Sequence, residues 1–130
     1  MPIACARDDE NLRLVLTATG KVTEGDINAQ IDRQIADGVW QYAVLYDIRG
    51  APEFPEMSTI FDLVALVRDR IAQYGPRGPV AIVTDRAHEQ RAWMYASLTD
   101  ASRMTVSYFS SMEDATAWLA QVRQPERGPS

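Results

Sequence analysis

The chain has 130 residues, of which 46% are hydrophobic and 24% are charged, as is typical of one globular domain with its own apolar core. Its formal net charge of −5, without a basic stripe, argues against binding to nucleic acids or anionic membranes. A single cysteine, Cys5, excludes an intrachain disulfide, and we expect this residue to be buried among small apolar neighbours.

The first two elements are expected to be strands of one hairpin. Residues 3–7 and 12–18 are rich in apolar side chains, and a short polar segment connects them. In the second strand, Leu12, Leu14 and Leu16 alternate with other residues, which predicts one buried face. The short connection favours an antiparallel pair.

A helix is expected over residues 24–37. Thr23 is a good N-cap residue, and Asp26 supplies a weaker version of the capping box. Gly38 suits the position that follows the last turn of a helix. A narrow apolar stripe predicts packing along one side of the helix; it consists of Ile27, Ile31 and Ile35.

Residues 41–48 predict the central strand of a sheet. Apolar residues follow one another there almost without alternation, which is typical of a strand whose two faces are both covered. Asp47 and Arg49 stand at its C-terminal end. The following segment, residues 50–56, contains two prolines and Phe54, and we expect it to be a loop.

Helices and strands alternate over the rest of the chain. The pattern predicts a helix over 57–74, a strand over 80–84, a helix over 86–99, a strand over 103–109 and a helix that ends near residue 123. On the helix over 86–99, the inner face is expected to comprise Ala87, Met94 and Leu98, with His88, Arg91 and Tyr95 along one flank.

Two large apolar residues are expected on polar helix faces. Leu66 falls on the polar side of the helix over 57–74, and Trp93 on that of the helix over 86–99. An isolated exposed leucine needs no explanation. Trp93 either covers a neighbouring element or anchors a protein interface, where tryptophan is enriched. Leu66 and Trp93 are therefore the candidate interface residues.

The order of elements is ββαβαβαβα. Right-handed crossovers make the later strands parallel, so we expect an α/β fold: a single-domain mixed, mainly parallel sheet with helices packed against it. The domain is expected to occupy residues 1–123, and residues 124–130 to form a polar C-terminal tail.

Several local strings follow one another at characteristic positions. They are Gly20-Lys-Val-Thr with Asp26, Leu45-Tyr-Asp-Ile-Arg49, Val80-Ala-Ile-Val83, and Phe109 followed by Ala115-x-x-Trp118-Leu119. Their order over nearly the whole chain resembles the SpoIIAA-like (STAS-like) family, small bacterial domains related to anti-sigma-factor antagonists and more remotely to lipid-binding CRAL-TRIO domains. The resemblance implies a STAS/SpoIIAA-like fold and a regulatory role.

The resemblance raises the question of a phosphorylated serine. Anti-sigma-factor antagonists carry one in an Asp-x-Ser motif just after the strand equivalent to residues 42–48. This chain has Asp47-Ile-Arg-Gly50 there, and no serine at that spacing. Ser58 and Thr59 come later, near the start of a helix, where a phosphate would be electrostatically favourable. Whether either is phosphorylated stays open.

Ligands of open α/β sheets gather beyond the C-terminal ends of the parallel strands. We expect this rim to carry the candidate residues for contact with a ligand or partner: Asp47, Arg49, Phe54, Ser58, Asp85 and His88. A simpler interpretation stays open, in which Asp85 caps a helix and Asp47 pairs with Arg49. In that interpretation His88 is a solvated residue.

Three functions are compatible with these observations. The first is a non-enzymatic bacterial regulatory domain that binds a protein partner or self-associates as a homodimer or higher oligomer. The second is a domain that binds or senses a small apolar ligand or lipid, for which Phe61 and Phe54 could line a pocket beside the helix over 57–74. The third is an enzyme that uses Asp47, Asp85 and His88 as acid–base groups.

Neither a metal nor a cofactor is expected. One histidine and no paired cysteines argue against a zinc site, and Gly75-Pro-Arg-Gly-Pro79 lacks the lysine and the spacing of a phosphate-binding loop. No secretion signal opens the chain, and no segment approaches the ~20 apolar residues of a membrane span. A cytoplasmic location is therefore expected.

Overall fold

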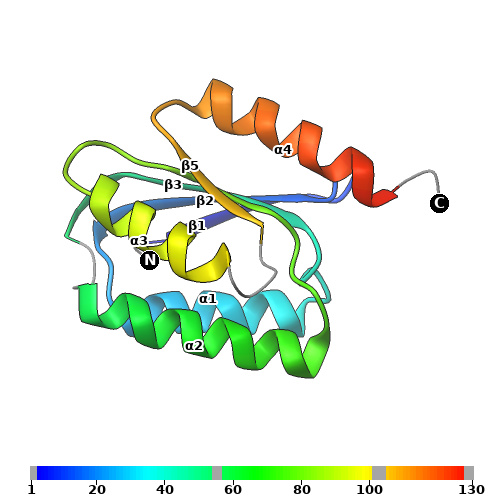
Figure 1. The fold of residues 1–130 in the computed structure, drawn as a ribbon, viewed down its shortest axis with the longest axis horizontal. Coiled ribbons are helices and arrows are strands. Elements are labelled where there is room, and N and C mark those ends of the chain that lie inside the picture. Colours follow the sequence, from blue (N-terminus) through cyan, green and yellow to red (C-terminus); the bar gives the residue numbers. More distant parts are fainter. Residues whose placement is uncertain (1–2, 54–56, 101–104, 128–130) are drawn as a thin grey trace.

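A computed structural model describes residues 3–53, 57–100 and 105–127 of the chain. Its elements follow the expected order ββαβαβαβα (Figure 1). The strands are β1 (Ile3–Asp8), β2 (Arg13–Lys21), β3 (Ala43–Glu53), β4 (Val80–Val83) and β5 (Val106–Phe109). The helices are α1 (Glu24–Ala36), α2 (Met57–Tyr74), α3 (Glu89–Asp100) and α4 (Met112–Arg127).

The five strands that the structure describes form one sheet in the order β1-β2-β3-β4-β5, so that β3 lies at its centre. β1 and β2 are antiparallel, and the other neighbouring pairs are parallel. The expected hairpin, the mixed, mainly parallel sheet and the central strand are therefore confirmed.

β3 is longer than the sequence predicted. It extends to Glu53, although a loop was expected from residue 50 onwards. Its pairing with β4 ends at Asp47, opposite Val83, and beyond this point it pairs with β2 alone. Because that part of β3 has no hydrogen bonds to β4, Pro52 is tolerated there despite its missing N–H.

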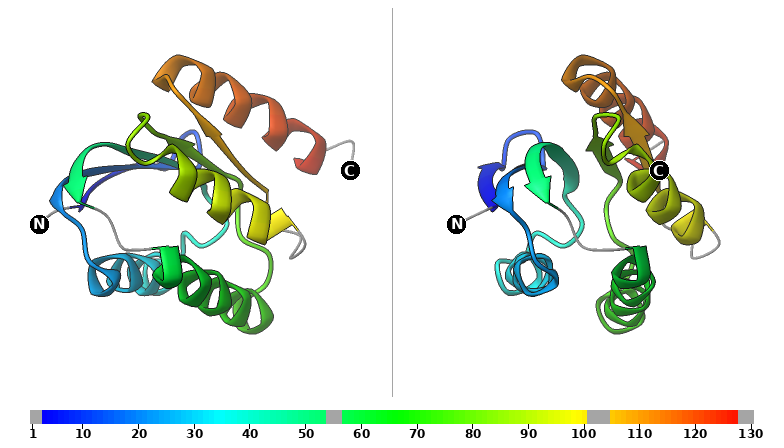
Figure 2. Two further views of the ribbon diagram at one scale, coloured as in Figure 1. Left: turned by 60° about the vertical axis from the view of Figure 1, so that its left-hand side comes forward. Right: turned by 90° about the vertical axis from the view of Figure 1, so that its left-hand side faces the viewer.

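The helices cover both faces of the sheet. α1, α2 and α3 pack on one face and α4 on the other (Figures 1 and 2). Along β3, Val44 and Ile48 belong to the cluster with α1–α3, whereas Ala43 and Leu45 belong to the cluster with α4. Burial of both faces explains the nearly continuous apolar run of this strand. Among the helices of the described residues, none is long and apolar enough to cross a membrane.

The two ends of α1 follow the sequence pattern. The main-chain N–H of Asp26 donates to Thr23 Oγ1 (3.2 Å), and the Asp26 carboxylate accepts from the main-chain N–H of Thr23 (2.9 Å). Gly38 follows the last turn with a φ of +74°, which glycine adopts without steric cost. The predicted capping box and terminal glycine are confirmed.

The inner face of the helix after β4 differs from the prediction. His88, Ala92 and Tyr95 are buried, whereas Ala87 is exposed. The prediction that Ala87 faces inward is wrong. It considered only the apolar residues of this helix, whereas the polar ring of His88 is buried because it has a hydrogen-bond partner, the main-chain oxygen of Ala51. The Leu98 side chain lies outside the described part of the structure.

Several exposures also differ from expectation. Leu66 is partly buried against the core, so it does not lie on an exposed face as predicted. Phe61 is 53% exposed, and Trp93, as predicted, lies off the core with 50% exposure. Cys5 is exposed rather than buried, because it lies on the edge strand β1.

Candidate functional site

At the rim of the sheet, Asp47 and Arg49 form a bidentate ion pair. Arg49 Nε and Nη2 donate to the two carboxylate oxygens of Asp47, each at 3.0 Å, and the Arg49 main-chain N–H adds a third bond of 3.1 Å. Hydrogen bonding by the Arg49 side chain is the main reason why the pKa of Asp47 lies below its usual value. These bonds match the simpler interpretation, in which the pair is structural.

His88 is a buried residue that ties α3 to the central strand. Only 4% of it is exposed, and its Nε2 lies 2.6 Å from the main-chain oxygen of Ala51. A carbonyl oxygen can only accept, so Nε2 carries the hydrogen of this bond. The expectation of a solvated histidine is therefore wrong.

The three residues expected to act together in an enzyme have different partners. Asp47 binds Arg49, the Asp85 carboxylate accepts from the main-chain N–H of His88 (3.2 Å), and the His88 ring binds the main chain of β3. Each bond stabilises local backbone structure. Of the other candidate rim residues, Phe54 and the side chain of Ser58 lie outside the described part of the chain.

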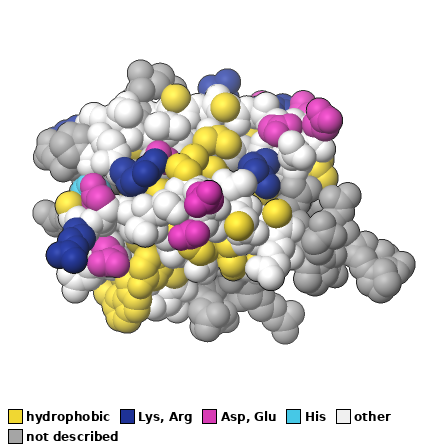
Figure 3. Space-filling view, turned by 90° about the horizontal axis from the view of Figure 1, so that it is seen from above, with side chains coloured by type: hydrophobic (Ala, Val, Ile, Leu, Met, Phe, Trp, Pro, Cys, Tyr) yellow, Lys and Arg dark blue, Asp and Glu magenta, His cyan; other side chains and the backbone are white. Residues whose placement is uncertain are grey.

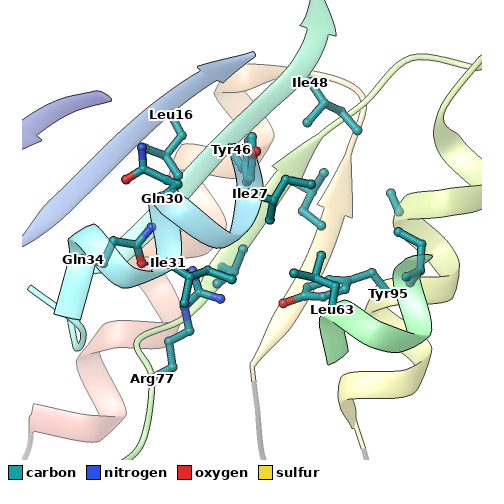
Figure 4. Close-up of a pocket in the computed structure, with 14 residues that line it drawn as sticks. Leu16, Ile27, Gln30, Ile31, Gln34, Tyr46, Ile48, Leu63, Arg77 and Tyr95 are labelled. Atoms are coloured by element: carbon teal, nitrogen blue, oxygen red, sulfur yellow. Dashed lines mark hydrogen bonds between the residues drawn. The ribbon is translucent and has the colours of Figure 1, made fainter. Parts of the chain in front are cut away.

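A cavity of about 70 Å³ lies between the sheet and the layer of α1, α2 and α3 (Figure 4). Its lining is mostly apolar and consists of Leu16, Ile27, Gln30, Ile31, Gln34, Tyr46, Ile48, Ile60, Leu63, Arg77, Val80, Ile82, Ala92 and Tyr95. α2 contributes Ile60 and Leu63 to it, whereas the exposed Phe61 is not among the lining residues. α2 therefore lies beside an apolar cavity, as expected, but Phe61 is not part of the cavity wall.

Three polar groups of this lining are buried without a hydrogen-bond partner among the described residues. They are Gln34 Nε2, Tyr46 Oη and Arg77 Nε. Gln34 is 2% exposed, and its Oε1 accepts from Arg77 Nη2 at 3.1 Å. Buried polar groups are nearly always satisfied in folded proteins, so three such atoms around one cavity make it the candidate binding site.

Arg77 is held in place by the segment between α2 and β4. Its guanidinium lies over the ring of Trp40, 5.0 Å from the ring centroid, and Trp40 Nε1 donates to the main-chain oxygen of Gly75 (3.0 Å). Gly78 lies so close to Tyr42 that a β-carbon on it would overlap the Tyr42 main-chain oxygen. The position of Arg77 is therefore set by tight packing on both sides.

The ion pairs of the described residues join exposed or partly exposed side chains. On the face shown in Figure 3, basic and acidic side chains lie beside one another. Ion pairs join Arg7 to Asp9, Arg33 to Asp37, Arg49 to Asp47, and Arg70 to Asp32 and Asp69. Among the described residues, no carboxylate pairs with Arg77.

The cavity keeps its two tyrosines protonated. Burial raises the pKa of Tyr46 and of Tyr95, and the positive charge of Arg77 opposes this rise without cancelling it. Both hydroxyls therefore retain a hydrogen that they can donate at neutral pH.

Gln34, Tyr46 and Arg77 were missed by the sequence reasoning. Gln34 continues the apolar stripe of α1, three residues after Ile31, and is therefore a polar residue on an inner face. Tyr46 lies between inward residues of β3, and Arg77 stands in a rigid glycine–proline turn. A polar residue on a predicted buried face was the signal that could have identified the first two.

The comparisons with known proteins agree with this architecture. A family model described as SpoIIAA-like matches residues 13–120. A similar solved structure is an uncharacterized protein of the DUF3478 family with a SpoIIAA-like fold from Shewanella loihica PV-4. It is 20% identical, with a TM-score of 0.58 over 90% of this chain and 91% of that chain. Among curated proteins there is no significant match. The family match spans most of the sheet and its helices, and the chain therefore belongs to the SpoIIAA-like family.

Proposed function

We propose that this SpoIIAA-like domain is a non-enzymatic module that binds a small, mostly apolar ligand between the sheet and α1–α3. The observation that carries the proposal is the apolar cavity around which Gln34, Tyr46 and Arg77 bury polar atoms without protein partners. Small-molecule sites typically combine an apolar lining with a few polar groups that orient the ligand. The regulatory role expected from the family resemblance would then be exercised through ligand binding.

The size of the cavity defines the size of the ligand. One buried water needs roughly 10–15 Å³ on the same measure, so the cavity of about 70 Å³ encloses on the order of five non-hydrogen atoms, which is close to the hydrocarbon chain of a six-carbon ligand whose head group lies at the half-buried Arg77. At ~24 cal/mol per Å³, a cavity of this size costs the free protein roughly 1.5–2 kcal/mol. A ligand that fills it recovers part of this cost.

The rim supports the non-enzymatic part of the proposal. Asp47 binds the neighbouring Arg49 and His88 binds the main chain of β3, and these bonds hold the rim in place. Acid–base catalysis requires groups within hydrogen-bond reach of one substrate position.

The test is an NMR titration of the ¹⁵N-labelled chain with 1-hexanol, with a variant that fills the cavity. Ala92 is buried in the cavity wall, whereas Ala72 is exposed on α2, so Ala92→Leu and Ala72→Leu add the same atoms at an inner and an outer position. We expect chemical shift changes around the cavity, binding at least about tenfold weaker in Ala92→Leu, and no change in Ala72→Leu. Unchanged affinity in Ala92→Leu would contradict the proposal.

Self-association is a second candidate function, and two exposed aromatic residues favour it. Phe61 on α2 and Trp93 on the neighbouring α3 are 53% and 50% exposed. Aromatic residues are enriched in protein interfaces. We expect sedimentation velocity to show a homodimer that Trp93→Ala weakens and Tyr74→Ala, at another exposed aromatic position, leaves intact. A monomer at all concentrations argues against this function.

A further inference from the structure

The polar end of the cavity carries a positive charge that the protein does not balance. Arg77 is half-buried and is the charged residue of the lining. Its contacts are the neutral amide oxygen of Gln34, the neutral hydroxyl of Tyr95 and the ring of Trp40, and no carboxylate of the described residues forms an ion pair with it. Charges inside proteins are normally paired, because desolvation of an unpaired charge is costly.

The groups without partners line the same cavity as this charge. The bond from Arg77 Nη2 to Gln34 Oε1 orients the amide, so that Gln34 Nε2, on the same amide carbon, lies next to the guanidinium. The reverse orientation would place two donors against each other. Tyr46 lines the same cavity as Arg77 and Gln34. Figure 4 shows the three side chains approaching the cavity from α1, from β3 and from the segment before β4.

All three groups act as hydrogen-bond donors. Arg77 Nε, Gln34 Nε2 and the protonated Tyr46 hydroxyl each offer a hydrogen, and the first belongs to a cation. The complementary ligand group therefore supplies acceptor oxygens and a negative charge. Carboxylates and phosphates both do so and are the usual partners of arginine.

The charge and the volume favour a carboxylate over a phosphate. A single guanidinium balances one negative charge, whereas a phosphate monoester carries close to two at neutral pH. The rest of the lining is apolar and encloses space for on the order of five atoms, which suits a short hydrocarbon body.

We infer that the ligand is a small monocarboxylic acid whose carboxylate is bound by Arg77, Gln34 and Tyr46 and whose short aliphatic body fills the cavity. This assignment rests on the proposed ligand-binding function and adds the chemical class of the ligand.

Two probes of equal chain length test the assignment. Isothermal titration calorimetry of the full chain at neutral pH compares hexanoate with 1-hexanol, which share a hydrocarbon body and differ in the head group. We expect hexanoate to bind about tenfold or more tightly, because its charge-assisted hydrogen bonds are stronger than those of a hydroxyl. Equal affinities, or tighter binding of hexyl phosphate than of hexanoate, would overturn the carboxylate assignment.

The variant Gln34→Glu probes Arg77 without changing the shape of the site. The new carboxylate lies where Arg77 already donates, so it forms an internal ion pair and competes with the ligand. We expect hexanoate affinity to fall about tenfold or more, whereas 1-hexanol affinity should change much less because its hydroxyl is uncharged. Gln90→Glu, at an exposed position on α3, controls for the added negative charge. Unchanged hexanoate affinity in Gln34→Glu would overturn the inference.

Arg77→Gln is a second, independent variant, and it should remove the preference for hexanoate over 1-hexanol. If that preference persists, the inference is wrong.

The two proposals fail in different ways. If neither probe changes the NMR signals of the cavity residues, the ligand-binding function itself is wrong. If both bind in the cavity with equal affinity, the function stands and the carboxylate assignment is overturned.

Discussion

Replacement of Tyr46 by phenylalanine should stabilise the free protein while it weakens the binding of hexanoate. The ring lies on the inner face of β3, and its hydroxyl is buried without a partner among the described residues. Phenylalanine keeps the ring and removes the oxygen. The substitution therefore separates the effect of the hydroxyl on the free energy of unfolding from its effect on ligand affinity.

The magnitude follows from the missing hydrogen bond. A buried polar group without a partner costs about 1–3 kcal/mol, and its removal recovers this amount. For a domain of this size, 1 kcal/mol raises Tm by roughly 3–5 °C, so Tyr46→Phe should melt roughly 3–15 °C higher. Urea denaturation should show a higher midpoint at an unchanged slope, since the same surface is exposed on unfolding.

Tyr95→Phe is the matched control. Tyr95 is also buried in the cavity wall, but its hydroxyl interacts with Arg77, which lowers its pKa against the larger effect of burial. Removal of this hydroxyl should leave stability unchanged or reduce it by about 0.5–1.5 kcal/mol. If Tyr46→Phe destabilises the free protein as much as Tyr95→Phe does, the Tyr46 hydroxyl has a partner inside the fold and the reasoning is refuted.

Three further changes test the scaffold by urea denaturation. Gly78→Ala should lower the free energy of unfolding by about 2 kcal/mol or more, because its β-carbon overlaps the main-chain oxygen of Tyr42, whereas Gly25→Ala, with ordinary contacts in α1, should be neutral or stabilising. Thr23→Ala should cost about 1 kcal/mol, since it removes the side-chain acceptor of the α1 capping box; a loss below ~0.3 kcal/mol would contradict this. Asp47→Asn should cost less than about 1 kcal/mol at neutral pH. Because the neighbouring guanidinium lowers the Asp47 pKa, this stabilisation is present above about pH 3.9 and is lost as the pH falls through the lowered pKa, so the stabilities of wild type and variant should converge in acid.

Much of the fold could be predicted from local pattern. The capping box at Thr23, the glycine after α1 and the apolar run of β3 each depend on residues close together in the chain. Such signals identify an element and its ends because the hydrogen bonds that satisfy a helix terminus are local. The alternation of strands and helices then restricts the topology to a mainly parallel sheet.

The burial of His88, just before α3, and the end of β3 could not be predicted in the same way. His88 is buried because Ala51, 37 positions away in the chain, offers its main-chain oxygen. Pro52 is part of a strand because β4 has already ended on that side of the sheet. In both cases a distant segment supplies or withholds a hydrogen-bond partner, and the pattern around the residue does not record this.

The sequence by itself determined the family, the order of the elements and the central position of β3. The tertiary structure alone decided where the cavity of the proposed ligand site lies. The sequence directed attention to the charged tip of β3, whose side chains bind local partners, whereas the cavity lies deeper, beside Tyr46 on the same strand. Its walls come from three helices and four strand or loop segments. A cavity is the volume that close packing leaves unfilled, so it depends on how all these elements meet and on no single one of them.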